Sequence, residues 1–171
     1  MATATDSVAS VTRGAFPAQL KVGLIEKEVS FVTESAELAA QGDGVLATGD
    51  VIQVFSLPAG TLILAAGMEV TELVAGATQL VCDLGTGDDA DQFVDGSDAG
   101  SPCDIGSSGS QAAVGTYSDL ADSITTTTAG KSKVLSSADT LDITAQAMTG
   151  AITAGKVRVW ALIADIDGTS V

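Results

Sequence analysis

Five aspartates in the segment DLGTGDDADQFVD are the side chains best suited to chemistry: Asp83, Asp88, Asp89, Asp91 and Asp95. Carboxylate oxygens are the ligands of calcium, which binds about six to eight oxygens. The spacing does not match an EF-hand loop, so we interpret the cluster as a solvated acidic loop and predict no metal site. Two carboxylates could also hydrolyse a glycosidic bond, but sugar sites usually add stacking aromatic residues. This chain has one Trp, one Tyr and four Phe, which does not favour that activity.

Two segments invite comparison with a phosphate-binding P-loop. GAITAGK at 150–156 has the right spacing, but Val157 stands where a Ser or Thr would hold magnesium, and a strand is predicted where the motif needs a helix. In GKS at 130–132 the first glycine is missing, because Thr125 stands in its place. We therefore predict a turn at the first segment and a loop at the second.

The usual catalytic groups are missing from the composition. There is no His and no Asn, so Ser/His/Asp and Cys/His catalysis are excluded, as is N-glycosylation. The two cysteines, Cys82 and Cys103, cannot form a four-ligand zinc site alone. Cys82 is predicted to be a small buried strand residue, and two thiols are favoured over a disulfide. We predict no catalytic residue, no cofactor and no enzymatic activity.

The charge distribution limits the partners. The net charge is -15, and residues 28–130 carry no Lys or Arg. Nucleic-acid binders gain affinity from cationic side chains that release counterions, and anionic membranes attract basic residues. We therefore exclude nucleic-acid and membrane partners and retain a neutral or basic protein surface.

No segment is predicted to cross a membrane or to direct secretion. The longest apolar run, 62–68, is far shorter than the roughly 20 residues of a transmembrane helix. The N-terminus lacks a basic leader followed by an apolar segment and a cleavage site. We expect a soluble protein made in a host cytoplasm.

The elements that would position these residues are mainly strands. Alternating or β-branched runs predict strands at 20–26, 29–32, 50–58, 61–74, 79–85, 140–148 and 156–166. One or two helical turns are predicted at 34–41. The aromatic residues Phe55 and Trp160 are predicted to lie in the core, and Gly67 is predicted to mark a bulge or bend.

The strands predict an all-β protein. We expect one domain at 20–171, an antiparallel β-sandwich or jelly roll, preceded by an extended N-terminal arm at 1–19. Residues from about 86 to 132 are rich in Gly, Ser, Thr and Asp, so this stretch is predicted to be a long loop or insertion. A sandwich leaves sheet edges to protect, and oligomerisation is one way to cover them.

Residues 50–96 resemble a family of small structural proteins encoded in the head-gene regions of tailed bacteriophages. The shared pattern is a strand ending in a PAG turn, a long aliphatic strand, and a strand ending in DLGTGD before an acidic loop with an aromatic residue, here Phe93. The C-terminal AGKVRVWALIADID is similar to the last strand of that family. The resemblance implies a β-rich virion protein, often an oligomer, without a cofactor. The Ser- and Gly-rich insertion after Phe93 departs from the family pattern.

The function that this resemblance implies is decoration of an assembled capsid. A symmetric oligomer, a trimer by resemblance alone, would bind the major capsid protein across capsomer junctions on the outer surface of the virion. The arm at 1–19 and the sheet edges are the predicted contacts. Two alternatives stay open: a tail, fibre or baseplate component, and a calcium- or carbohydrate-dependent adhesion module.

Overall fold

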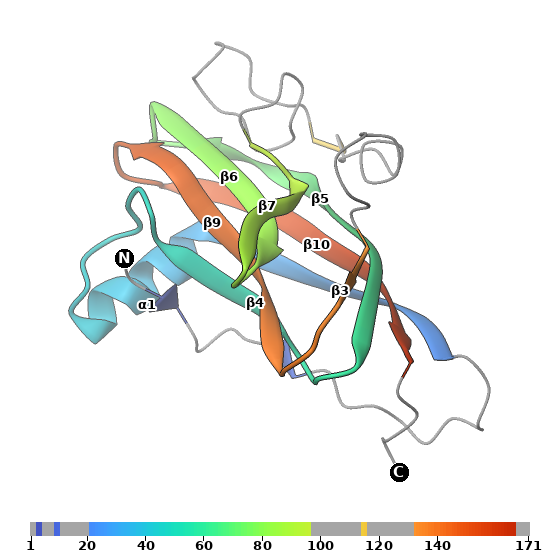
Figure 1. Cartoon of the computed structure of the whole chain (residues 1–171). Coiled ribbons are helices and arrows are strands. Elements are labelled where there is room, and N and C mark those ends of the chain that lie inside the picture. The colour runs from blue at the N-terminus through green and yellow to red at the C-terminus, as the bar shows by residue number, and fades with distance from the viewer. Residues whose placement is uncertain (1–2, 5–8, 11–20, 97–113, 116–131, 167–171) are drawn as a thin grey trace.

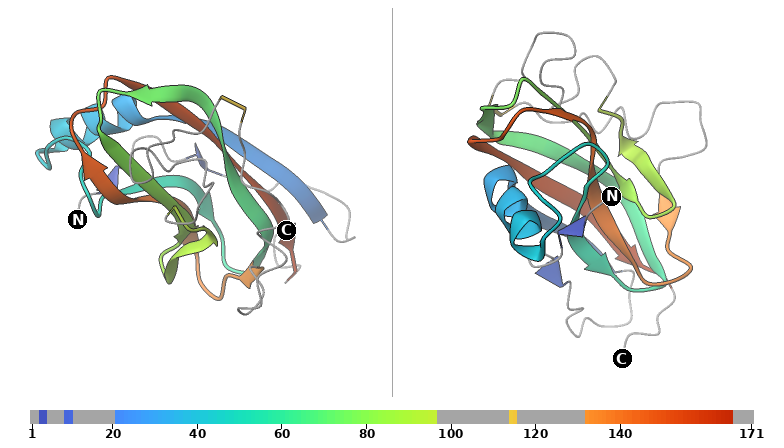
Figure 2. Two further views of the ribbon diagram at one scale, coloured as in Figure 1. Left: turned by 90° about the horizontal axis from the view of Figure 1, so that it is seen from above. Right: turned by 90° about the vertical axis from the view of Figure 1, so that its left-hand side faces the viewer.

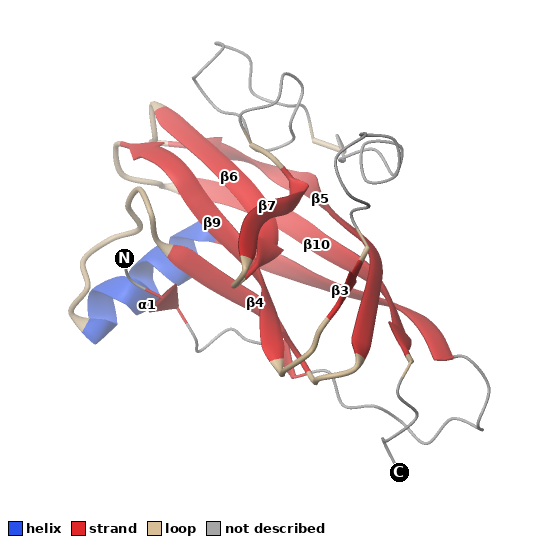
Figure 3. Ribbon diagram, in the orientation of Figure 1, coloured by secondary structure: helices blue, strands red, loops and turns tan. Residues whose placement is uncertain are grey.

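The fold consists of two β-sheets packed face to face, with one helix at one edge of the two layers (Figure 1, Figure 2). The computed structural model describes residues 3–4, 9–10, 21–96, 114–115 and 132–166. Strands predominate in this part of the chain, as Figure 3 shows, because Val, Ile, Leu and Thr recur in short runs separated by glycine turns. The predicted antiparallel sandwich is confirmed, and the jelly-roll variant stays a prediction.

The larger sheet, here called sheet A, has β9 and β6 in its interior. Its main strands follow the order β4 (Val51–Leu57), β9 (Asp139–Thr149), β6 (Gln79–Thr86) and β7 (Asp89–Val94), all antiparallel. The outer edge of β4 pairs in parallel with two short segments, β1 (Thr3–Ala4) and β2 (Ala9–Ser10).

The second sheet, sheet B, is built around its best-patterned strand. The order is β3 (Lys21–Ser30), β10 (Ala154–Asp165), β5 (Thr61–Ala75) and β8 (Lys133–Val134), and all pairs are antiparallel. In β10 the predicted alternation is confirmed: Val157, Val159 and Ala161 are buried. The intervening residues lie on the outer face of the sheet.

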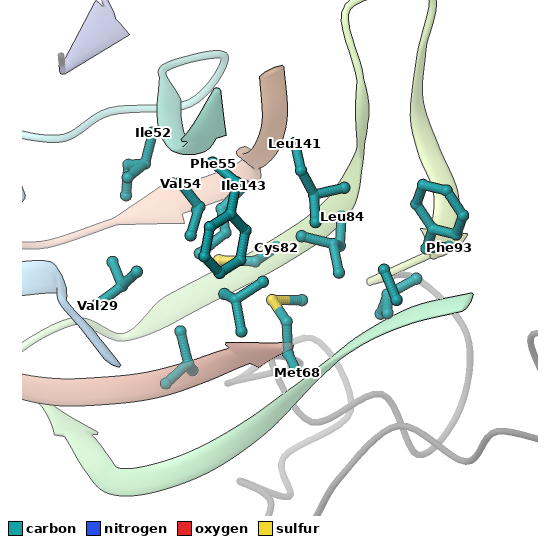
Figure 4. Close-up of a cluster of buried hydrophobic side chains, with 14 of the residues drawn as sticks. Val29, Ile52, Val54, Phe55, Met68, Cys82, Leu84, Phe93, Leu141 and Ile143 are labelled. Atoms are coloured by element: carbon teal, nitrogen blue, oxygen red, sulfur yellow. The ribbon is translucent and has the colours of Figure 1, made fainter. Parts of the chain in front are cut away.

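The core fills the space between the inner faces of the two sheets. Figure 4 shows Met68 of β5 pointing toward side chains of sheet A, among them Cys82 and Ile143. The largest fully buried side chains are aromatic and branched aliphatic residues from both sheets and from α1: Phe31, Phe55, Phe93, Leu38, Ile52, Leu57, Ile63, Met68, Leu80, Leu84, Leu141 and Ile143. Burial of each such side chain contributes about 1.5–3 kcal/mol, so this cluster is the main source of stability.

The first predicted strand pair is wrong. Residues 21–30 form one continuous strand, because no turn residue separates the runs at 20–26 and 29–32. The chain then enters α1 (Phe31–Gln41), so Phe31 and Val32 belong to the helix. Ser30 caps the helix by accepting a hydrogen bond from the Thr33 amide, and Gly42 ends it with φ 90°.

Two further strand predictions need correction. Residues 89–94 lie in the stretch predicted as a loop, yet they form β7, which pairs with β6. Strands β4, β5 and β6 have the predicted positions but are not neighbours of one another, because the chain changes sheet at each of the turns between them. The turn at 58–60 is therefore a corner of the sandwich. Among the described residues, no helix is long and apolar enough to cross a membrane.

Candidate interaction surfaces

The five aspartates are dispersed around the β6–β7 hairpin. Asp83 is buried on β6, its Oδ1 accepts a hydrogen bond from the Gly96 amide at 2.8 Å, and burial raises its pKa. Asp88 is exposed and forms an ion pair with Lys133 at 2.9 Å. No group of three His, Cys, Asp or Glu side chains in the described part of the chain is placed to hold a metal ion.

The remaining hairpin carboxylates lie on the exposed edge of sheet A. Asp89 and Asp91 are both exposed on β7. A hydrogen bond with the Asp89 side chain is the main cause that raises the pKa of Asp91, and burial adds to it. This edge therefore presents concentrated negative charge, which repels other acidic chains.

The first candidate phosphate loop, at 150–156, is a turn followed by a strand. Gly150 lies in the turn between β9 and β10 with φ 93°, which confirms the predicted turn, and Lys156 belongs to β10. Lys156 Nζ lies 3.6 Å from Glu28 Oε1 and 3.5 Å from Glu72 Oε2. Residues 125–131 of the second segment lie outside the described residues.

Besides Asp83, a second buried carboxylate of sheet A belongs to Asp142. Asp142 of β9 is 7% exposed, and its Oδ1 has no hydrogen-bond partner among the residues that the structure describes. Burial raises the pKa of Asp142 to about 6, although a hydrogen bond with the Thr140 side chain favours the charged form.

The outer face of sheet B is divided into a charged half and an apolar half. Directly paired residues of antiparallel strands point to the same face, so the register places side chains in rows across the sheet. In the charged half, Arg158 pairs with Glu28 and Glu69, and Arg158 Nη1 lies 3.2 Å from Glu69 Oε2. The Thr71 hydroxyl donates to Glu28 Oε2 at 3.1 Å. These exposed ion pairs contribute little to stability, typically about 0–1 kcal/mol each.

The apolar half of that face, here called the apolar patch, lies toward the other end of the sheet. Leu24 pairs with Leu162, and the next row joins Val22 to Ala164, Leu62 and Val134 across all four strands. Leu24 is 63% exposed, Val134 50% and Val22 47%. Ala164, in the middle of the row, is buried, and Leu62 is partly exposed, so the exposed apolar side chains lie on either side of them.

Trp160 belongs to this outer face, so its predicted place in the core is wrong. It is half-buried and lies between Glu26 of β3 and Gly67 of β5 in the register. Phe55 is buried as predicted. Cys82 is fully buried among core residues, which confirms the prediction of a small buried strand residue. Cys103 lies outside the described residues.

Sequence reasoning missed the apolar patch, although the signal was present. The strands at 20–26 and 156–166 have large apolar residues on both faces, Leu24 and Ile25 in one and Leu162 and Ile163 in the other. A strand with one face in water normally alternates apolar with polar residues. Leu24 and Leu162 break that alternation and could have indicated an outer apolar surface.

Comparison with known proteins identifies fold relatives only. No family model matches the chain, and no curated protein matches it. A chain from the solved capsid of Ralstonia phage GP4 superimposes with a TM-score of 0.51 and 15% sequence identity, covering 95% of this chain and 99% of that one. A chain from the cyanophage Pam1 capsid asymmetric unit gives a TM-score of 0.48 at 17% identity, covering 91% and 93%. At this level of identity, the likeness to the GP4 chain shows a shared fold over nearly the whole length of both chains.

Proposed function

We propose that this protein is a structural component of a tailed-phage virion that decorates the outer surface of the capsid. The observation that carries the proposal is the match over 95% of this chain and 99% of a chain in the Ralstonia phage GP4 capsid. The two chains are nearly equal in length, so the match involves a whole small capsid-associated chain and not one domain of a larger protein. The phage-head resemblance of residues 50–96 supports the same conclusion independently.

The partner that we propose is the major capsid protein, bound across junctions between capsomers. The apolar patch of sheet B offers exposed Leu24, Val22 and Val134 for such a contact. The net charge of -15 on the whole chain favours a partner whose own rim is neutral or basic. A small homo-oligomer, a trimer by resemblance, would repeat this modest contact and gain avidity.

The N-terminal arm is the second proposed contact. Its described segments, Thr3–Ala4 and Ala9–Ser10, pair with the edge of β4 over two residues each. Pairing this short is easily exchanged, because only a few hydrogen bonds hold it, each with a net value of about 1 kcal/mol. The arm could therefore reach a neighbouring protein by strand addition, which gains affinity from main-chain hydrogen bonds.

Neither alternative receives comparable support. An adhesion module that uses calcium would bring several carboxylates together, whereas Asp83 bonds the Gly96 amide and Asp88 pairs with Lys133. A tail or baseplate component would share the β-rich composition, but the fold likeness is to a chain of a capsid structure. We propose a structural role without catalysis.

The test is co-sedimentation of purified protein with expanded capsids that lack decoration. Binding should saturate at a fixed ratio to the major capsid protein and should raise the temperature at which the capsids rupture. The double variant Leu24→Lys/Val134→Lys should bind weakly, while Val45→Lys, at an exposed position remote from sheet B, should bind normally. Labelling of tails and not of heads would overturn the proposal in favour of the tail alternative.

A further inference from the structure

The two sheets of the sandwich have four edges, and three of them are protected over at least part of their length. The edge of β4 is covered by β1 and β2, and β5 is covered at Leu62 and Ile63 by β8, which is itself only two residues long. The edge formed by β7 carries the exposed carboxylates of Asp89 and Asp91. Covering, shortening and charging are the devices by which proteins prevent unwanted strand pairing.

The fourth edge, β3, begins with the charged residue Lys21, but residues 22–25 have none of these devices. The strand is ten residues long, and among the described residues β10 is the only strand that pairs with it. Val22, Gly23 and Leu24 are all exposed, although their side-chain positions alternate between the two faces. A long edge with exposed apolar residues is a template for an added strand.

We propose that β3 pairs with β3 of a second copy of this chain, antiparallel and centred on Gly23. A two-fold axis through Gly23 would set Val22 of each copy opposite Leu24 of the other, on the same face as the apolar patch. Sheet B would then continue from one molecule into the next as a single sheet.

Charge favours a second copy as the occupant. The chain carries 22 acidic residues, but the five residues 21–25 that would pair contain none of them, so two copies can approach here without direct repulsion. No heavy atom lies within 4 Å of the position that a Cβ on Gly23 would occupy. A side chain introduced at Gly23 therefore has room on that face of the sheet.

The β3–β3 contact would join one oligomer to another and would not hold the subunits of a cyclic oligomer together. An isologous two-fold contact closes a dimer and cannot close a trimer. If the protein forms trimers through other surfaces, β3 pairing would link one trimer to the next. The inference does not depend on capsid binding, because it concerns only copies of this chain.

Site-directed disulfide formation tests the contact directly. In a background with Cys82→Ala and Cys103→Ser, a single Gly23→Cys would meet its own copy across the axis, at a Cα separation suited to a disulfide. The matched control is Glu26→Cys on the same strand and the same sheet, because in this register residue 26 lies far from residue 26 of the other copy. Gly23→Cys should give about tenfold more covalent dimer than Glu26→Cys under mild oxidation of equal protein concentrations.

A second measurement uses the unmodified cysteines. Val22→Lys/Leu24→Lys should shift sedimenting species to half the mass or less, with an unchanged circular dichroism spectrum, since both residues are exposed. Equal cross-linking of the two cysteine variants, no cross-linking of either, or an unchanged sedimentation profile of the lysine variant would overturn the proposal. Capsid binding is not a readout in either experiment, so failure here leaves the proposed function to its own test.

Discussion

Asp142 illustrates how a single residue in this sandwich couples stability to pH. Its carboxyl group is buried without a partner for Oδ1 among the described residues, which disfavours the charged form. Because folding raises its pKa from 3.8 to about 6, the folded state holds the proton more tightly than the unfolded state does. The stabilisation is therefore complete below pH 3.8 and is lost as the pH rises through about 6.

We predict that Asp142→Asn is more stable than the wild type above pH 6. Asn resembles the protonated acid, so the free energy of unfolding should rise by about 1–2 kcal/mol at pH 8, with the difference vanishing near pH 4. Urea denaturation of both proteins at pH 4 and pH 8 measures this difference in the free energy of unfolding. Asp43→Asn, in the exposed turn after α1, is the control and should show no such dependence. A variant less stable than the wild type at pH 8 would mean that the charged carboxylate has a stabilising partner.

Cys82 should be dispensable for assembly. It is fully buried, but it is one small residue in a core with many larger aliphatic and aromatic side chains. The double variant Cys82→Ala/Cys103→Ser should lose about 1 kcal/mol, which lowers the melting temperature by about 2–4 °C. Analytical ultracentrifugation should give the same oligomer as the wild type. Gross unfolding at room temperature would contradict this expectation.

Calcium should not raise the melting temperature of the protein by binding to the aspartates of the β6–β7 hairpin. Among the described residues they do not form a group that could hold a metal ion, and Asp88 already has Lys133 as its partner. The melting temperature of the wild type should be the same with calcium and with a chelator, and so should that of the variant Asp88→Asn/Asp89→Asn/Asp91→Asn. A calcium-dependent rise in the wild type alone would reveal a metal site.

At the scale of elements, the β6–β7 hairpin depends on Gly85, where the backbone of β7 passes very close to the backbone of β6. A Cβ at this position would collide with the backbone of Asp89 and Ala90 in β7. We predict that Gly85→Ala costs about 3 kcal/mol, because backbone atoms cannot move aside as a flexible side chain would. Gly23→Ala is the matched control: its Cβ would meet nothing, so stability should stay equal or rise by about 0.5 kcal/mol. Chemical denaturation of both variants provides the comparison, and equal losses would contradict it.

The sequence predicts strand positions here better than strand partners. The runs that became β4, β5, β6, β9 and β10 were located within a few residues, because β-branched residues and glycine turns are local signals. Pairing is decided by which inner faces bury together, so the change of sheet after 57 could not be inferred from the PAG turn. Strand β7 was missed because its acidic residues at 89–91 are typical of loops, while its pairing with β6 is a tertiary effect.

Gly67 and Trp160 show a similar limit. Gly67 was expected to mark a bulge, but the register shifts of β5 lie on either side of its pair with Trp160. A glycine opposite a large indole leaves room for the ring on the outer face. The sequence holds both residues, yet only the register brings them together.

For the whole molecule, the charge balance and the fold point to a partner of a particular kind. A net charge of -15 disfavours nucleic acid, and the partner that we propose for the apolar patch is a protein surface that is neither polar throughout nor acidic. The candidate surfaces could be predicted only in outline, as sheet edges and an arm. The strand order of a sheet decides which strand lies at an unpaired edge. The pairing register decides which apolar side chains gather on one face, and neither can be inferred from the sequence of a single strand.

The last prediction concerns the arm, for which we propose different roles within and between molecules. Its described segments add two short parallel pairings to β4, so deletion of residues 1–16 should cost the fold only about 1–2 kcal/mol. If the arm contacts a neighbouring protein in the virion, the same deletion should weaken co-sedimentation with expanded capsids much more, by about tenfold or greater in affinity. A chain that carries a scrambled sequence of the same sixteen residues is the control for length and composition, and it should bind as weakly as the deletion. Thermal denaturation and capsid titration of the three proteins separate the two roles. Full capsid affinity in the deletion variant, combined with a large loss of stability, would assign the arm to the fold alone.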